Sequence, residues 1–379
     1  MRTNLQHEEE ATACSESAPE QIHELEHECS VLALAVSDDY IFAGTHKGEI
    51  VVWSLNSFQI VQNIQAHKRS VLCLFLSADS AYLLSSACEP IINVWCPRTF
   101  TRLYEIYSTY NVGDVFSIAY SAQHQTVYMG TQTQYIQWVD LKDSKRRVTQ
   151  DAEQHPDRRH HRFFDSRAVG GTSTPRRIED RWSLIPRADN VLEIDAGAIK
   201  EYAHFGWVHC MLVAKGPTVF VDPDEEVLIS GGGDGTIKLW KLLENGPDHD
   251  LGENVKGDIE EIMCLGEESA DSIVSLAIDG SFLYSGKRYE GTIELWDLDT
   301  KQKLRVISAH DGDVMALQMS FGLLWSASTT GTASVTRLDR NYLFLASHSA
   351  NKCRRSTALS IMDETQEVRP RISAKSTTA

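Results

Sequence analysis

The stretch SGGGDGTIKLWKL at 230–242 contains residues that could bind a ligand. In it, four glycines and an aspartate precede an alternating apolar run. A Walker phosphate loop requires Gly-x-x-x-x-Gly-Lys-Ser/Thr, so that backbone N–H groups and a lysine hold an anion at the start of a helix. Here Thr236 follows Gly235, and the run after it is β-branched and aromatic. The pattern favours a tight turn between two strands, and we expect no nucleotide cofactor.

Two other groupings contain residue types that are used in catalysis. His204, Ser230 and Asp234 could form a Ser-His-Asp relay, but no Gly-x-Ser-x-Gly elbow is present to expose a nucleophile. His155 and Asp157 form a His-x-Asp pair, but the apolar strand and downstream carboxylates of a paired-zinc hydrolase do not accompany it. We therefore expect no catalytic, cofactor-binding or metal-binding residues, and a structural role for the first grouping.

Composition narrows the classes of function. The 379 residues carry a formal net charge of −17, which disfavours binding to nucleic acid or to an anionic membrane. No run of about 18 apolar residues occurs, so no transmembrane helix is expected. The first thirty residues hold eight glutamates and no apolar signal segment, and the eight cysteines form no Cys-x-x-Cys pair. Together these features predict a cytoplasmic protein without a disulfide framework.

The elements that must position these residues recur along the chain. Copies of the strand pattern at 230–242 lie at 47–55, 89–97, 134–141, 290–298 and 330–338. All copies except the last carry a tryptophan, and Thr336 stands at that place in the last one. His67, His204 and His310 each precede an apolar strand upstream of a copy. Each repeat therefore reads as a strand, a turn, a strand ending in Ser or Thr, a tight turn and a further strand.

These repeats resemble the WD-repeat family, whose copies of about 40 to 45 residues form the four-stranded blades of a β-propeller. The resemblance implies an all-β WD40 propeller with six recognisable blades, where seven are usual, and four antiparallel strands per blade. It also implies that a hydrogen-bonded set of His, Ser or Thr, an acidic residue and Trp pins each blade. The matching positions are His204, Ser230, Asp234 and Trp240, then His67, Ser85, Glu89 and Trp95, in part His310 and Ser326, and the blade tryptophans Trp53, Trp138 and Trp296.

The repeat also sets expectations for stability and for domain boundaries. A single blade cannot bury both of its faces, so blades must stack, and the blade that has Thr336 in place of an indole is expected to be the weakest. We predict a disordered acidic arm at 1–21, a propeller over 22–340 and a degenerate blade or disordered tail at 341–379. Two insertions are expected, a long one at 142–203 and a shorter one at 243–271.

The long insertion is basic within an acidic protein. Over 142–187, twelve lysines and arginines face seven acidic residues. The segment is either a mobile solvated loop or a docking element for an acidic partner. Adjacent phenylalanines are costly to leave in water and favour docking. The candidate partner-binding residues are Arg158, Arg159, Phe163, Phe164 and Trp207.

Three stretches resemble one particular group of WD-repeat proteins: IYSTYNVGDVFSIAY at 106–120, HHRFFDSR at 160–167 and IKEYAHFGWVHCM at 199–211. They are similar to the propeller half of the fungal peptidase-like subunit of the glutathione-degrading complex. The resemblance implies a propeller that precedes a di-zinc peptidase domain, and a glutamine-amidotransferase-like partner with which the γ-glutamyl bond of glutathione is cleaved. Nothing in 1–379 resembles the peptidase portion, so the implied role is a non-catalytic cytosolic scaffold.

Two other hypotheses stay open. The chain could be a generic WD40 adaptor, for example in ubiquitin ligation or signalling, because the fold hosts many unrelated roles. It could also be a fragment of a zinc-dependent dipeptidase-type hydrolase, if a peptidase domain was lost from a longer product. Turnover of glutathione or Cys-Gly by the purified chain distinguishes the enzyme from either binding protein.

Overall fold

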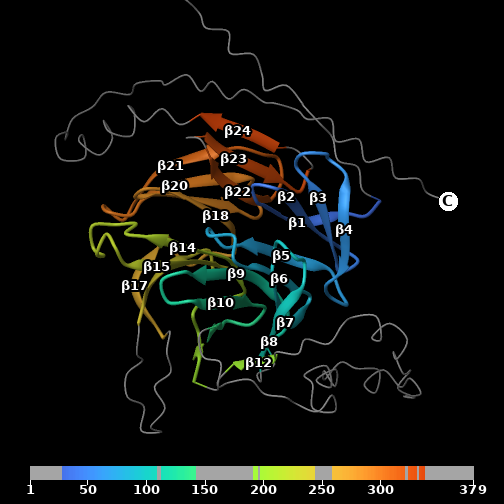
Figure 1. Cartoon of the computed structure of the whole chain (residues 1–379). Helices are drawn as coiled ribbons and strands as arrows, with labels where there is room; N and C mark the ends of the chain where they lie inside the picture. The colour runs from blue at the N-terminus through green and yellow to red at the C-terminus, as the bar shows by residue number, and fades with distance from the viewer. Residues whose placement is uncertain are drawn as a thin grey trace, which may run out of the picture.

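The computed structural model describes residues 28–108, 112–141, 191–194, 197–243, 258–320, 323–330 and 333–337. Within these ranges every helix or strand is a β-strand, and the strands form six sheets that follow one another around a central axis (Figure 1). The colours in Figure 1 run once round the ring, so neighbouring sheets in sequence are neighbours in space. The predicted all-β propeller is confirmed.

The first three sheets occupy the blue-to-green part of the ring. The first comprises β1 (Val31–Val36), β2 (Tyr40–Thr45), β3 (Glu49–Ser54) and β4 (Ile60–Gln65). The second comprises β5 (Val71–Leu76), β6 (Leu83–Ala87), β7 (Glu89–Trp95), β8 (Arg102–Ser108) and β12 (Val191–Ile194). The third comprises β9 (Val115–Ser121), β10 (Thr126–Thr131), β11 (Ile136–Asp140) and β13 (Ile199–Lys200).

The last three sheets complete the described ring. The fourth comprises β14 (Val208–Lys215), β15 (Glu226–Gly232), β16 (Ile237–Leu242) and β17 (Ile259–Leu265). The fifth comprises β18 (Ile273–Asp279), β19 (Phe282–Lys287), β20 (Thr292–Asp297) and β21 (Gln302–Ser308). The sixth has three described strands, β22 (Val314–Ser320), β23 (Leu323–Ser328) and β24 (Ala333–Arg337).

The second sheet differs from the expected four antiparallel strands. β12 pairs in parallel with β8 and adds a fifth, outermost strand, in which Leu192 and Ile194 are buried. β12 and the two-residue β13 both lie within the insertion predicted at 142–203, and β17 lies within the one predicted at 243–271. The described parts of both segments therefore contribute strands to the sheets. Short strands such as VLEI carry too few residues for periodicity to distinguish them from a loop.

The sheets stack through apolar faces that meet along the inner strands. β1, β5, β9, β14, β18 and β22 contact one another in this order, and one buried cluster extends across the second, third and fourth sheets. Near the end of the second strand of most sheets a glycine faces the start of the next inner strand. At Gly130 an added Cβ would lie 2.9 Å from the carbonyl oxygen of Val208, so only glycine permits this approach. Close stacking of neighbouring sheets therefore depends on these positions.

Candidate functional site

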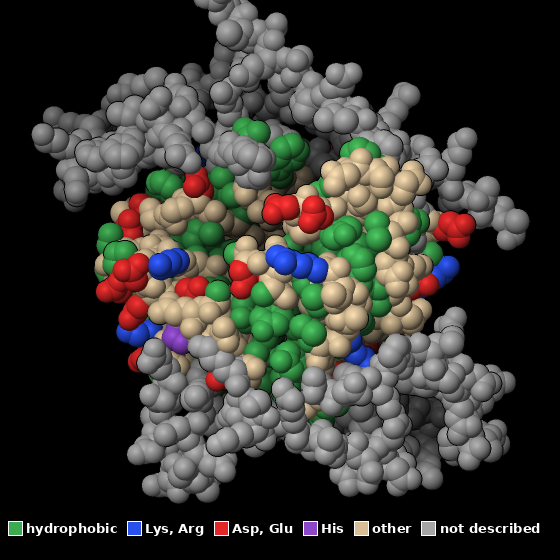
Figure 2. Space-filling view, in the orientation of Figure 1, with side chains coloured by type: hydrophobic (Ala, Val, Ile, Leu, Met, Phe, Trp, Pro, Cys, Tyr) green, Lys and Arg blue, Asp and Glu red, His purple; other side chains and the backbone are tan. Residues whose placement is uncertain are grey.

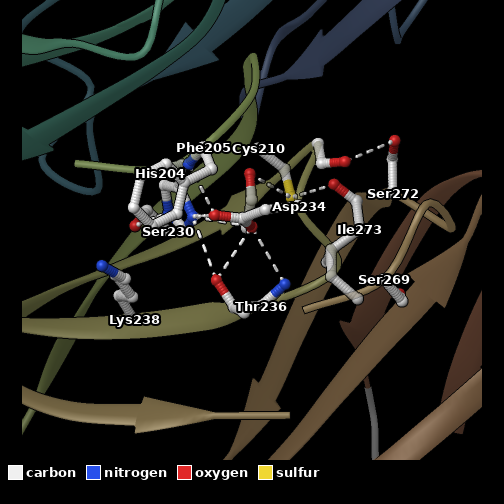
Figure 3. A network of polar contacts seen from close by, with 12 residues as sticks. His204, Phe205, Cys210, Ser230, Asp234, Thr236, Lys238, Ser269, Ser272 and Ile273 are labelled. Atoms are coloured by element: carbon white, nitrogen blue, oxygen red, sulfur yellow. Dashed lines mark hydrogen bonds and ion pairs between the residues drawn. The ribbon is translucent and has the colours of Figure 1, made fainter. Parts of the chain in front are cut away.

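The loop before β14 brings His204 against the second and third strands of the fourth sheet (Figure 3). The side chain of His204 is fully buried, and its Nε2 lies 2.8 Å from Ser230 Oγ. The Trp240 indole donates its Nε1–H to the same hydroxyl oxygen over 2.8 Å. The Ser230 hydroxyl thus links a histidine in a loop to a tryptophan that lies ten residues after Ser230 on the next strand.

Asp234 completes this set from the turn between β15 and β16. Its carboxylate lies 3.1 Å from His204 Nδ1 and accepts hydrogen bonds from the backbone N–H groups of Thr236 and Phe205. Burial alone would raise the pKa of Asp234, but the hydrogen bond and charge of His204 hold that pKa well below its usual value. Because the carboxylate is a hydrogen-bond acceptor, Nδ1 of His204 donates to it and Nε2 accepts from Ser230.

The same arrangement recurs in the second sheet with a glutamate as the acid. His67 Nδ1 lies 2.7 Å from Glu89 Oε1, and His67 Nε2 lies 2.8 Å from Ser85 Oγ. The Trp95 indole donates to Ser85 Oγ over 2.9 Å. Burial would raise the pKa of Glu89, but the hydrogen bond and charge of His67 keep it below its ordinary value. The longer glutamate side chain therefore replaces aspartate without loss of the histidine contact.

Parts of the set are present in the fifth and sixth sheets. His310 Nε2 lies 2.9 Å from Ser326 Oγ in the sixth sheet, where the backbone of Thr336 pairs with Leu324. In the fifth sheet Trp296 donates to Ser285 Oγ over 3.1 Å. Ser285 was not predicted from the sequence. It lies eleven residues before its tryptophan, whereas Ser230 and Ser85 each lie ten residues before theirs. The tryptophans Trp53, Trp138 and Trp296 are 4%, 1% and 6% exposed.

These histidine, serine and acidic side chains have a structural role. The hydroxyl of Ser230 is fully buried and is already engaged by an imidazole and an indole, so no substrate carbonyl can reach it. The network ties the loop that precedes an inner strand to the two strands beside it. Among the residues with described positions, no group of three or more His, Cys, Asp or Glu could hold a metal ion. Of the predicted partner-binding residues, Arg158, Arg159, Phe163 and Phe164 lie outside the described ranges.

Trp207, the remaining predicted partner-binding residue, belongs to an aromatic cluster at the same end of the fourth sheet. Its ring stacks on Phe116 of β9, with ring centroids 5.3 Å apart and planes inclined by 16°. His209 of β14 contacts both rings, at 5.6 Å from Phe116 and 5.7 Å from Trp207. Trp207 is 43% exposed and Phe205 beside it 67%. Sequence reasoning missed Phe116 and His209, because Phe116 meets the other two rings only when the third and fourth sheets stack. It also missed Phe205, which lies two positions before Trp207 in the same loop.

The surroundings of this cluster are charged. Burial and the nearby Arg288 guanidinium lower the pKa of His209 to about 4, so that the imidazole is neutral at pH 7. Arg288 lies over the ring of Tyr289 at 5.3 Å and pairs with Asp313 at 3.7 Å. On the face drawn in Figure 2, acidic side chains lie mainly over the part of the ring that carries β14 to β21, and hydrophobic ones gather over the first three sheets. The described part of the chain contains no helix long and apolar enough to cross a membrane.

Comparison with known families agrees with the repeats found above. The family model for the WD domain, G-beta repeat, matches residues 58–96 and 199–241. WD40 repeats are present in this chain. The two matched segments contain the two complete polar sets, those of Trp95 and Trp240.

Several curated proteins are similar over part of their length. The chain is 26% identical over 352 residues to the Saccharomyces cerevisiae protein named "Probable di- and tripeptidase DUG2", which covers 82% of this chain and 38% of that protein. It is 24% identical over 298 residues to the human kinesin-like protein KIF21B, which covers 74% of this chain and 17% of that protein. The small ribosomal subunit protein RACK1 of Neurospora crassa is 28% identical over 137 residues, 36% of this chain and 37% of that protein. The chain thus spans well under half the length of these relatives.

Among solved structures, U3-55K superposes with a TM-score of 0.53 at 15% identity, and the match covers 84% of this chain and 80% of that one. At this level of identity the likeness concerns the fold. It agrees with the propeller that the sheets form here.

Proposed function

We propose that this chain is a non-catalytic WD40 scaffold that holds a glutamine-amidotransferase-like subunit in a cytoplasmic glutathione-degrading assembly. The observation that carries the proposal is the similarity to the yeast protein over 82% of this chain, together with the stretches that resemble the propeller of the peptidase-like subunit. The name of that yeast protein describes a di- and tripeptidase. The present chain corresponds to 38% of it, and the described residues of the present chain form propeller sheets.

The described geometry supports binding over bond-making. The serine, histidine and acidic side chains of the polar sets are buried and engaged with one another, whereas Trp207 and Phe205 are exposed. Partly exposed tryptophan and phenylalanine are the residue types that anchor protein interfaces. A propeller that offers such anchors at one end can hold a second protein while the chemistry takes place elsewhere.

A direct binding experiment tests the proposal. Purified chain is mixed with the purified glutamine-amidotransferase-like subunit of the yeast glutathione-degrading complex, and the mixture is examined by size-exclusion chromatography with light scattering. We expect a stable complex whose mass equals the sum of the two components. Separate elution at concentrations of about 50 μM, well above the dissociation constant of an ordinary specific complex, would contradict the proposal.

The contribution of the basic insertion is tested separately. We propose that Arg158, Arg159, Phe163 and Phe164 contact the partner, with Trp207 as a further anchor. Deletion of residues 155–167 should then weaken the complex by about tenfold or more. An unchanged complex would remove the insertion from the binding surface and leave the scaffold role intact.

A second candidate function is a generic WD40 adaptor, which the similarities to kinesin-like and RACK1 proteins favour. Affinity purification that returns ubiquitin-ligase or signalling subunits, without any amidotransferase-like protein, would select it. Assays of glutathione and Cys-Gly hydrolysis with added zinc address the dipeptidase alternative, and we expect no turnover above the blank.

A further inference from the structure

The aromatic residues around Trp207 come from segments of the third, fourth and fifth sheets that are linked by ring contacts and hydrogen bonds. Gly233 N–H donates to the Trp207 carbonyl oxygen, Ser272 Oγ donates to the Gly233 carbonyl oxygen, and Tyr289 N–H donates to Asp271. The Trp207 ring stacks on Phe116 of the third sheet, and the His209 ring lies against both at a tilt.

Arg288, which follows β19 of the fifth sheet, is near enough for its charge to lower the pKa of His209. Tyr289, which is 66% exposed, lies beside Arg288. The backbone N–H of Phe205 donates to the Asp234 carboxylate over 2.8 Å (Figure 3), and its side chain is 67% exposed. We call Phe116, Phe205, Trp207, His209 and Tyr289 the aromatic patch.

Three residues of the patch differ in exposure from the buried tryptophans of the repeats. Trp53, Trp95, Trp138, Trp240 and Trp296 are 1% to 6% exposed, whereas Phe205, Trp207 and Tyr289 are 43% to 67% exposed. Phe205 and Trp207 lie in the loop that precedes β14, and Tyr289 lies in the turn between β19 and β20, so the stacked faces of the sheets do not cover these side chains. Exposed aromatic residues that gather in this way mark interaction sites in soluble proteins.

Acidic side chains lie beside the patch in three segments: the β17–β18 connection, the β19–β20 turn and the β21–β22 connection. Ser269 N–H in the first segment donates to the Asp234 carbonyl oxygen, and Asp313 in the last pairs with Arg288. Asp271 is linked to Tyr289, whose backbone N–H donates to Asp271 Oδ1 over 2.9 Å. The other Oδ of Asp271 is buried and has no hydrogen-bond partner among the described residues. The carboxylates of this border outnumber its cationic groups, Lys287 and Arg288. They are those of Glu267, Glu268, Asp271, Glu290, Asp311 and Asp313, which we call the acidic rim.

Aromatic faces beside carboxylates suit a cationic group with a flat, weakly hydrated surface. Arginine combines both features, because its guanidinium stacks on aromatic rings and forms paired hydrogen bonds with carboxylates. The surface already contains one example: Arg288 stands over Tyr289 while it pairs with Asp313. Nucleic acid, which also stacks on aromatic rings, would bring phosphates against the acidic rim.

We propose that the aromatic patch and the acidic rim receive an arginine-bearing segment of a partner protein, with a guanidinium stacked on Trp207 and neighbouring apolar side chains on Phe205 and Tyr289. The assignment rests on the proposed binding role, since it specifies the chemistry of the partner segment. It does not depend on which protein supplies that segment.

The test uses the full chain and a short fluorescein-labelled peptide in which a phenylalanine stands between two arginines. Fluorescence anisotropy should show saturable binding that weakens as salt rises from about 0.02 M to about 0.15 M, because the rim is partly screened. Replacing the arginines of the peptide with lysines should weaken binding several-fold, and replacing them with glutamates should abolish it.

Matched variants locate the site. Trp207→Ala should weaken binding by about tenfold or more, and Glu267→Gln combined with Glu268→Gln by about threefold. Phe220→Ala is the control, because Phe220 is 59% exposed but follows β14, whereas Trp207 precedes it. It should leave the affinity unchanged, and circular dichroism should show the same fold for all variants.

Three results would overturn the inference: equal binding of the glutamate peptide, unchanged affinity in Trp207→Ala, or peptide binding that emerges only after deletion of residues 142–190. The last would assign the surface to the basic segment of the chain itself. If the peptide fails to bind while the amidotransferase-like subunit still forms a complex, the arginine assignment fails and the scaffold role survives. If the peptide binds and that subunit does not, the proposed partner is wrong and the surface assignment stands.

Discussion

At the scale of single residues, the hydroxyl of Ser230 serves two buried groups at once. Ser230→Ala would leave His204 Nε2 and the Trp240 indole N–H without partners inside the protein. We expect a loss of about 2 to 4 kcal/mol in the free energy of unfolding, measured by denaturant titration. Ser326→Ala is the comparison, because the His310 contact that it breaks is only partly buried, and it should cost about 1 kcal/mol. Equal losses in both variants would contradict this view of the polar sets.

His209 gives stability a dependence on pH. Its pKa is about 4 in the folded protein and 6.5 ordinarily, because burial and then Arg288 oppose protonation. Between these values the unfolded chain binds the extra proton, so the contribution of His209 is present above pH 6.5 and is lost as the pH falls towards 4. Lowering the pH from about 7 to about 5 should therefore cost the natural protein about 1 to 2 kcal/mol more than it costs His209→Gln. If the free energy of unfolding fell by the same amount in both proteins between the two pH values, His209 would not be the source of this pH dependence.

At the scale of elements, the close approach of neighbouring sheets depends on small residues at the ends of second strands. In Gly130→Ala the new methyl group would meet the backbone oxygen of Val208 on the next inner strand, which cannot rotate away. We expect the free energy of unfolding to fall by about 2 to 3 kcal/mol. Gly280→Ala is the control: it has a φ of 62° but nothing within 4 Å, so only backbone strain of about 1 kcal/mol is expected. A larger loss in the control would show that strand contact is not the cause.

The third sheet has a buried amide directly before its tryptophan. Gln137 is fully buried, and neither its side-chain nitrogen nor its oxygen has a hydrogen-bond partner in the described structure. The residue directly before the tryptophan is valine or leucine in the other sheets, as at Val94 and Leu239. Gln137→Leu should therefore raise the free energy of unfolding by about 1 to 2 kcal/mol, whereas Leu239→Gln should lower it. A lower midpoint of denaturation for Gln137→Leu would contradict this reading.

Much of the propeller could be predicted from the sequence, because the same pattern of strands and turns occurs in several copies. The spacing of Trp95 and Trp240 and the upstream histidines indicated both the strands and the polar sets that the structure contains. The aromatic patch could not be predicted in the same way, because Phe116 and Trp207 lie far apart in sequence and meet only through sheet stacking. β12 escaped prediction because four residues that pair in parallel with a distant strand leave no local pattern.

At the scale of the whole molecule, the two halves of the ring are joined by more than the covalent chain. β12 pairs with β8 across the segment at 142–190, β13 pairs with β11 across the same segment, and β14 packs against β9. A polypeptide interrupted between residues 150 and 185 therefore keeps every described strand contact. We expect residues 1–150 and 185–379, produced as two separate chains, to reassemble into one particle that co-elutes at the mass of the intact protein and separates in denaturing electrophoresis. Fusing the halves of a split reporter to these new termini would turn that reassembly into a signal, and mutually soluble halves that never associate would refute it.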